Sequence, residues 1–261
     1  MKLAFRKIGN GRPLFILHGL FGSSDNWQTL GKKFAGNFTV FLIDLRNHGR
    51  SPHSDEFSYR LMSEDLSELM EDEGIEKTTI LGHSMGGKAA MYFAALKPEL
   101  VEKLVVVDIG TREYRATNQH VIDALGHIDT RNLSSRKDAE EILKKYLDDE
   151  PTRQFLLKNL YWTDDGKLNW RFNFEAIRSN IKSIGEATPS LATLVHTPVL
   201  FVAGEDSDYL SRGDMEYIRA LIPLARLEII PGAGHWVHAD QPKLFFEAVM
   251  QFLVMPGDIL I

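Results

Sequence analysis

The sequence predicts a doubly wound α/β fold, in which a mostly parallel β-sheet carries helices on both faces. Short apolar runs recur along the chain. Most of them lack polar alternation, which is typical of strands buried on both faces of a parallel sheet. Helical patterns separate several of these runs, as alternating strands and helices require. With 261 residues, 44% of them apolar, the chain can fill the core of one large domain.

The predicted elements follow one another in the order of a wound sheet. Strands are predicted at residues 14–17, 40–43, 79–81, 104–107, 199–202 and 227–230. Helices are predicted between or after them, at residues 63–71, 88–96 and 243–253. Parallel strands end on one edge of the sheet, so the residues that follow them are the first candidates for a functional site.

The interval from residue 108 to residue 198 contains no predicted strand. Residues 135–147 form a helical pattern that begins at a serine cap, and residues 152–160 form another that follows Pro151. We therefore predict a core of residues 1–110 and 186–261, with residues 111–185 inserted as a helical cap (lid) over the C-terminal edge of the sheet. Aromatic residues of this interval are expected either to face that edge or to form the cap's own core. They are Tyr161, Trp162, Trp170, Phe172 and Phe174.

The composition excludes several classes of function. A net charge of -6 without a basic tract argues against a nucleic-acid partner. The absence of cysteine excludes disulfides, thiolate zinc sites and cysteine nucleophiles, and it agrees with a cytoplasmic location. The N-terminal stretch lacks the apolar segment of a signal peptide, and no run approaches the length of a membrane span, so no membrane partner is expected. No clustered ligand set suggests a metal, and no cofactor is expected.

A serine stands at the corner between predicted strand 79–81 and predicted helix 88–96, in Gly82-His83-Ser84-Met85-Gly86-Gly87. Such a corner strains the backbone, and side chains larger than hydrogen beside it would collide. The pattern Gly-x-Ser-x-Gly is weak by itself, but its place between a buried strand and an Ala-rich helix is that of a nucleophile elbow. Ser84 is the predicted nucleophile.

A serine hydroxyl needs a base to remove its proton and an acid to orient that base. His235 is the best candidate for the base, because it lies in a glycine-rich stretch after the last predicted strand and so at the same edge as Ser84. His83, beside Ser84 on a tight turn, is expected to point away and to be structural. His238 is an alternative base whose side chain we expect to be solvated.

Attack on a carbonyl creates an oxyanion, which fixed backbone amides stabilise. The Met85 amide follows the nucleophile and is one predicted donor. The other comes from the loop after the first central strand, where glycines let the backbone approach the substrate. We assign it to the Leu20 amide, with the Phe21 amide as the alternative.

The chain resembles the α/β hydrolases over essentially its whole length. Within that superfamily four stretches are similar to the YbfF-like serine esterases: HGLFGS at 18–23, DLRNHGRSPH at 44–53, GHSMGGK at 82–88 and VVVDI at 105–109. The second stretch is more distinctive than the elbow. Its residues are expected to shape the turn after a central strand, with a direct catalytic role for Arg46 or His48 as the alternative.

The acid remains open between two places in the sequence. In many α/β hydrolases it lies in a Gly-x-x-Asp loop after the penultimate strand, but here that loop begins at Gly204 and the position holds Ser207. YbfF-like esterases also depart from the common pattern, which implies an acid at the preceding strand end and matches Asp108. We therefore choose Asp108, with Ser207 bonded to the same carboxylate or histidine. Asp206 and Asp208 stay alternatives, and Asp108 could instead cap backbone amides.

These residues together predict acyl transfer through a covalent intermediate. The resemblance implies small to medium acyl esters as substrates, with acyl-CoA thioesters as a further class. A C–C bond or lactone hydrolase using the same triad, and a ligand receptor with this fold, are the alternatives. A small-molecule partner and a monomer or homodimer are expected. Residues expected in the substrate pocket are Phe21, Trp162, Phe172, Tyr209 and Trp236.

Basic residues around the predicted cap could meet the phosphates of coenzyme A. We interpret them instead as a solvated face. They are Arg112, Arg115, Arg131, Arg136 and Lys137.

Overall fold

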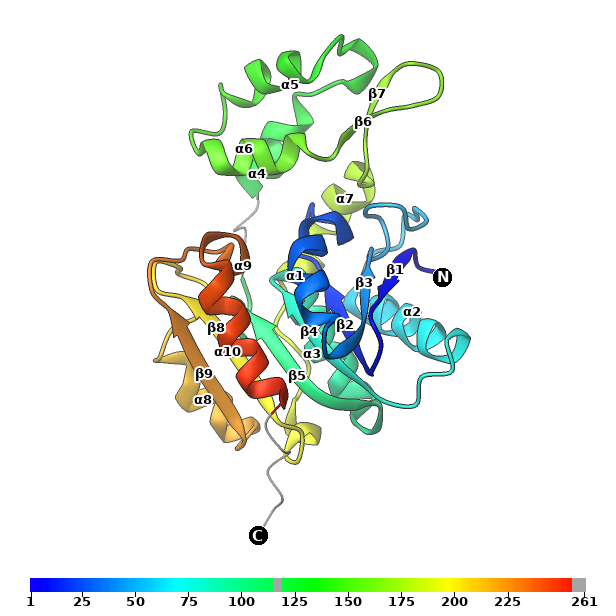
Figure 1. Ribbon diagram of the computed structural model, residues 1–261. Coiled ribbons are helices and arrows are strands. Elements are labelled where there is room, and N and C mark those ends of the chain that lie inside the picture. The colour runs from blue at the N-terminus through cyan, green and yellow to red at the C-terminus, as the bar shows by residue number, and fades with distance from the viewer. Residues whose placement is uncertain (115–118, 255–261) are drawn as a thin grey trace.

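The structure is a computed structural model that describes residues 1–114 and 119–254. Its centre is a seven-stranded sheet within the described residues (Figure 1). In spatial order the strands are β1 (Phe5–Ile8), β3 (Phe38–Ile43), β2 (Arg12–Leu17), β4 (Thr78–His83), β5 (Val101–Val107), β8 (Val199–Gly204) and β9 (Ala225–Ile230). All neighbours are parallel except β1, which runs antiparallel to β3. This confirms the predicted mostly parallel sheet.

Helices cover both faces of the sheet. Successive side chains of each strand point to opposite faces, so each strand packs against helices on both sides. Leu14 and Ile16 of β2 pack with α1 (Gln28–Phe34) and α10 (Pro242–Val254) on one face. Phe15 and Leu17 belong to the core on the other face, with α2 (Tyr59–Asp72), α3 (Met85–Leu96) and α8 (Asp214–Leu221). Burial on both faces explains why the central strands are continuous apolar runs.

The predicted strands and core helices are all present, and the structure extends most of them by a few residues. Strand β1 was not predicted. Its sequence, Phe5-Arg6-Lys7-Ile8, is only partly buried at the edge of the sheet, so it lacks the apolar run by which the central strands were found. Shorter helical elements are η1 (Ser24–Trp27), η2 (Pro98–Leu100), η4 (Ala192–Leu194) and α9 (Val237–Asp240).

The elements from α4 to α7, here called the insertion, lie beyond the C-terminal ends of the central strands (Figure 1). Its described elements are α4 (Gln119–Gly126), η3 (Thr130–Asn132), α5 (Arg136–Leu143), α6 (Glu150–Leu157), β6 (Leu160–Trp162), β7 (Leu168–Trp170) and α7 (Phe174–Gly185). The hairpin β6–β7 was not predicted. Helix 135–147 was predicted too long, because α5 ends at Leu143, and helix 152–160 was predicted two to three residues too late, because α6 spans Glu150–Leu157. The hairpin turn contains Gly166 with a φ of 76°, so this glycine is the turn signal in the sequence from which the hairpin could have been predicted.

Most aromatic residues of the insertion serve its own packing. Trp170 and Phe172 are buried, and their rings stack with centroids 5.0 Å apart. Trp162 is 53% exposed at the end of β6. Among the described residues, no helix combines the length and the apolar character that a membrane span needs.

Candidate active site

Ser84 occupies a strained corner between β4 and α3. Its φ of 52° and ψ of -116° lie outside the regions that L-residues favour. A Cβ atom at position 82 would lie 2.2 Å from the carbonyl oxygen of Gly86, and one at position 86 would lie 2.5 Å from that of Leu17. The two glycines of the motif are therefore required by contact with backbone, as the sequence analysis expected.

His235 bridges Ser84 and Asp108. Its Nε2 lies 3.1 Å from Ser84 Oγ, and its Nδ1 lies 2.7 Å from Asp108 Oδ2. Because the carboxylate only accepts hydrogen bonds, Nδ1 carries the proton, which leaves Nε2 free to accept the serine proton. The three side chains come from the ends of β4, β5 and β9, so the parallel sheet delivers them to one edge.

Asp108 directly follows β5 and is fully buried, with a φ of 49°. Besides His235, its carboxylate accepts hydrogen bonds from the Gly204 amide at 3.1 Å and from Ser207 Oγ at 2.5 Å. The Asp108 carboxylate can therefore orient His235 and cap a backbone amide at the same time. Ser207 is bonded to this carboxylate, as the sequence predicted. Asp206 and Asp208 are exposed, and within the described residues their carboxylates form no hydrogen bond or ion pair with His235.

The other two histidines near Ser84 are buried. His83 Nε2 donates to the His235 carbonyl at 2.8 Å, which agrees with the expected structural role. The expectation that His238 is solvated is wrong: it is 7% exposed and stacks on Trp27 at 4.1 Å. The short helix α9 turns His238 inward onto that ring. Burial lowers the pKa of His238 to about 3, which fits a neutral ring better than a base in use near neutral pH.

The candidate oxyanion donors flank Ser84 from two loops. In the part of the chain that the structure describes, the Leu20 and Met85 amides donate to no other group. The Phe21 amide instead donates to His48 Nε2 at 3.2 Å, so Phe21 is not available as the alternative donor. The Phe21 carbonyl accepts from Asn159 Nδ2 of the insertion at 2.7 Å. The peptide groups before and after Phe21 are therefore both fixed.

The distinctive stretch at 44–53 builds the loop that supports the oxyanion donors. His48 Nδ1 donates to the Arg46 carbonyl at 3.0 Å, so its two ring nitrogens join this loop to Phe21. His18 makes the matching link from the other loop. It donates to the carbonyl of its neighbour Gly19, and it accepts from the Leu45 amide at 3.0 Å. Burial lowers the pKa of His48 to about 3, which keeps the ring neutral and its acceptor nitrogen available.

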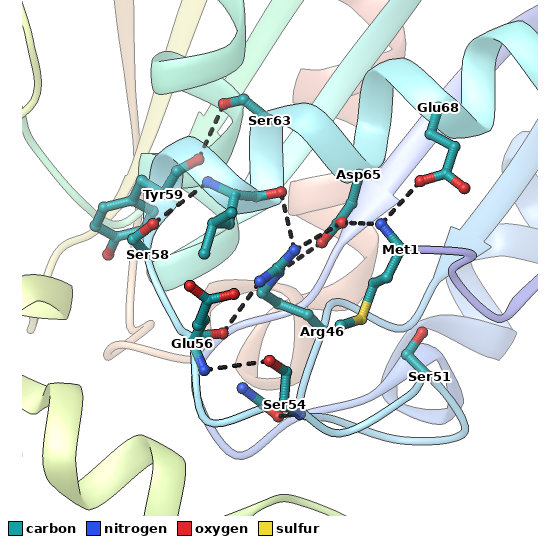
Figure 2. Close-up of polar contacts among 12 residues, drawn as sticks. Met1, Arg46, Ser51, Ser54, Glu56, Ser58, Tyr59, Ser63, Asp65 and Glu68 are labelled. Carbon is teal, nitrogen blue, oxygen red and sulfur yellow. Dashed lines mark hydrogen bonds and ion pairs between the residues drawn. The ribbon is translucent and has the colours of Figure 1, made fainter.

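Arg46 is held away from Ser84 by a buried ion pair. Its Nε and Nη2 donate to the two carboxylate oxygens of Asp65 on α2, at 2.6 and 2.8 Å, and its Nη1 donates to the Glu56 carbonyl (Figure 2). Neither Arg46 nor His48 contacts Ser84, His235 or Asp108 by hydrogen bond. Their geometry supports the expected role in shaping the turn.

Ser84 borders two spaces of different size. A narrow pocket of about 30 Å³ has apolar walls from Leu20, Ile109, Ile181 and Ile184. A wide chamber of about 850 Å³ lies between the sheet edge and the insertion, and Phe21, His235 and Trp236 line it. Tyr209 borders both spaces.

Two expected pocket residues lie elsewhere. Trp162 lines neither space, because the β6–β7 hairpin turns its side chain to solvent. Phe172 is buried behind Phe21, with ring centroids 5.0 Å apart, so it supports the wall without forming its surface. Among the described residues no group of three or more His, Asp or Glu side chains is arranged to hold a metal.

Comparisons with known proteins agree with this geometry. Residues 12–135 match the family described as alpha/beta hydrolase fold. The protein named sn-1-specific diacylglycerol lipase ABHD11 from Danio rerio is 40% identical, and the match covers 94% of this chain and 79% of that relative. The chain belongs to the α/β-hydrolase family.

Two further relatives of this α/β hydrolase are similar over almost their whole lengths. Esterase YbfF of Escherichia coli (strain K12) is 34% identical, with 94% of each chain covered. The solved structure described as a marine microorganism esterase is 44% identical with a TM-score of 0.93, and it covers 96% of this chain and 99% of its own. The resemblance inferred from the four sequence stretches is thereby confirmed.

Several residues that build the site of this α/β hydrolase were not identified from its sequence. Asn159 and Asp65 lie far along the chain from the loops that they hold. Lys88, by contrast, could have been noticed in the sequence. It is the one charged residue in the apolar, Ala-rich stretch from 88 to 96, and a helix that is apolar on all sides is expected to be buried. Its surroundings are described below.

Proposed function

We propose that this α/β hydrolase cleaves carboxylic esters through an acyl-enzyme formed on Ser84. His235 takes the serine proton as Ser84 attacks the carbonyl, and the Leu20 and Met85 amides hold the oxyanion. His235 then protonates the leaving group, and it activates the water that releases the acid. The continuous hydrogen-bond chain from Ser84 through His235 to Asp108 carries this proposal. At the coarser level the chain is a carboxylic ester hydrolase, as its esterase and lipase relatives indicate.

The position of His235 indicates which space holds the acyl group of the substrate and which holds the leaving group. The leaving group must receive a proton from His235 Nε2, and His235 lines the wide chamber but not the narrow pocket. The leaving group therefore belongs in the wide chamber and the acyl group in the narrow pocket. About 10–15 Å³ of such space holds one water molecule, so a pocket of about 30 Å³ admits a short acyl group.

The wide chamber can take a bulky alcohol or thiol. Lys158 and Arg171 of the insertion line it and offer positive charge to a leaving group that carries phosphates, as coenzyme A does. Of the basic residues considered from the sequence, Arg112, Arg131, Arg136 and Lys137 do not line this chamber, and Arg115 lies outside the described residues. A short-acyl thioester is thus the second candidate substrate.

We further propose that residues 111–185 act as a cap that bounds the wide chamber. Its lining by both the loop after β2 and the insertion supports this role. A small-molecule substrate, a monomer or homodimer, and a cytoplasmic location complete the proposal; the absence of cysteine supports the last of these.

The proposed function is tested by steady-state hydrolysis of p-nitrophenyl esters of increasing acyl length, with Ser84→Ala beside the wild type. We expect the highest kcat/KM for acetyl to butyryl esters and a loss of at least about a thousandfold in Ser84→Ala. Acyl-CoAs with the same acyl groups then test the thiol leaving group.

Two outcomes would contradict the proposal. Turnover that survives in Ser84→Ala would remove the nucleophile assignment. An absence of turnover on every ester and thioester, in a folded protein, would favour a C–C bond or lactone hydrolase, or a ligand receptor, over an esterase.

A further inference from the structure

Lys88 lies one turn into α3 after the nucleophile, and its amide donates to the Ser84 carbonyl at 3.0 Å. Its side chain is 1% exposed, which is rare for a lysine unless its ammonium is bonded. The Nζ atom donates to the carbonyls of Arg112 at 3.0 Å, of Gly185 at 3.3 Å and of Glu186. These bonds use the three donors of an ammonium group.

The three carbonyls belong to both connections of the insertion. Arg112 lies where the chain leaves the sheet edge after β5, and Gly185 and Glu186 lie where it returns after α7. The two connections also bond directly: the Tyr114 amide donates to the Gly185 carbonyl at 2.7 Å, and the Thr188 amide donates to the Thr111 carbonyl at 3.0 Å. Lys88 thus fastens both connections to the helix that begins at Ser84.

Tyr114 extends this contact to the loop after β8. Its hydroxyl donates to the Tyr209 carbonyl and accepts from the Gly110 amide at 2.8 Å. Its ring lies 5.0 Å from Lys88 Nζ on one side and stacks against the Tyr209 ring at 5.5 Å. A cation over an aromatic face is attractive, and more so where both are desolvated.

Tyr209 in turn contacts the base. Its ring stacks on the His235 imidazole with centroids 4.0 Å apart and an angle of 22° between the planes. Its amide donates to Ser207 Oγ at 3.3 Å, and Ser207 donates to Asp108. The rings of Tyr114, Tyr209 and His235, here called the ring column, therefore connect the Lys88 ammonium to the base.

We propose that Lys88 and Tyr114 are positioning residues, which hold the imidazole of His235 in line with Ser84 by fixing the insertion's connections against the loop that carries Tyr209. This inference rests on the proposed function of Ser84 and His235. It assigns no new chemistry to Lys88: all three of its N–H groups are bonded to main chain, so it has no donor left for a substrate in the adjacent narrow pocket.

The first test is Tyr114→Phe, which removes the hydroxyl and keeps the ring. We expect kcat on the best p-nitrophenyl ester to fall about tenfold while KM changes less than about twofold, since the ring that lines the narrow pocket is kept but the base is misaligned. Tyr209→Leu should cause a similar fall. Because both act through the same ring column, the double variant should lose much less than the product of the two single losses.

The second test is Lys88→Met, which keeps length and apolar bulk but removes the ammonium. Its matched control is Lys103→Met, because Lys103 on β5 is also buried and its Nζ donates to the carbonyls of Phe252 at 3.0 Å and Leu253 at 3.1 Å, away from the site. Both variants should lower the melting temperature. Only Lys88→Met should also lower kcat, by about tenfold or more, measured well below its melting temperature.

The outcomes separate this inference from the proposed function. Equal kcat in wild type, Tyr114→Phe and Lys88→Met, or fully multiplicative losses in Tyr114→Phe/Tyr209→Leu, would overturn the positioning role. If the wild type lacks Ser84-dependent turnover, the proposed function fails instead. The rate at which a fluorophosphonate labels Ser84 then still reports the alignment of His235, and equal rates in all variants would overturn the inference.

Discussion

At the scale of single residues, the proposed acid, Asp108, lies at the end of β5 and accepts a hydrogen bond from Ser207 in the loop after β8. Ser207 occupies the position where many α/β hydrolases carry the acid, and it donates to Asp108 from that position. The carboxylate reaches His235 from the neighbouring strand end instead, at 2.7 Å. Two adjacent parallel strands end close enough together that either can supply the group that orients the base.

The residue-scale prediction concerns this carboxylate. Asp108→Asn keeps the shape but replaces an acceptor by an amide, which no longer fixes the proton on His235 Nδ1. We expect kcat to fall on the order of 10³–10⁴-fold on p-nitrophenyl acetate. Asp206→Asn and Asp208→Asn are the controls, with changes under about threefold, since both carboxylates are exposed and away from His235. A larger loss in either control would move the acid to the later loop.

At the scale of elements, α7 closes the narrow pocket. Ile181 and Ile184 of this helix line it, and the helix then ends at Gly185, where Lys88 holds the chain. The Tyr59 hydroxyl of α2 donates to the Ile184 carbonyl at 2.7 Å and fixes the same turn. The end of one helix thereby sets the depth of the proposed acyl pocket.

The element-scale prediction is that Ile184→Ala lengthens the preferred acyl chain. Each methylene accommodated in an apolar pocket is worth about 1–3 kcal/mol, so kcat/KM for the hexanoyl ester should rise at least about tenfold relative to that for the acetyl ester. Ile177→Ala is the control, because Ile177 is buried in the same helix but lines neither space. A shift of equal size in both variants, measured over the same ester series, would contradict the assignment of the narrow pocket.

At the scale of the whole molecule, buried neutral histidines couple folding to pH. Burial lowers the pKa of His48 and of His238 to about 3, and it lowers those of His18 and His83 as well. In the unfolded chain each would titrate near 6.5. Between these values the unfolded state binds more protons, so the free energy of unfolding is highest above pH 6.5 and falls as the pH is lowered towards 3.

The whole-molecule prediction is that the free energy of unfolding falls as the pH is lowered below 6.5. Each such histidine contributes a slope of about 1.4 kcal/mol per pH unit below pH 6, which urea denaturation at a series of pH values measures. His48→Gln keeps an acceptor for the Phe21 amide and should reduce the slope by about that amount. His53→Gln, at an exposed position, should leave the slope unchanged. An equal slope in wild type and His48→Gln would show that His48 is protonated in the folded state.

Much of the fold and the centre of the site could be predicted, because both depend on local patterns. Apolar runs identified the central strands, and the strained Gly-Ser-Gly corner identified Ser84. The predictions were wrong where burial decides the position of a side chain. His238 was expected in solvent but stacks on Trp27, which lies near the other end of the sequence. Trp162 was expected in the pocket but lies exposed at the end of a hairpin strand.

By itself, the sequence determined the fold class, and it selected Ser84, His235 and the loop after β2 as candidates for the nucleophile, the base and an oxyanion donor. Strand period, backbone strain and chain position after a strand are local properties. Only the tertiary structure decided that Asp108 faces His235, that Phe21 is already bonded to His48, and that Lys88 joins both connections of the insertion. These contacts join residues distant along the chain. They depend on how parallel strands and the insertion meet at one edge of the sheet.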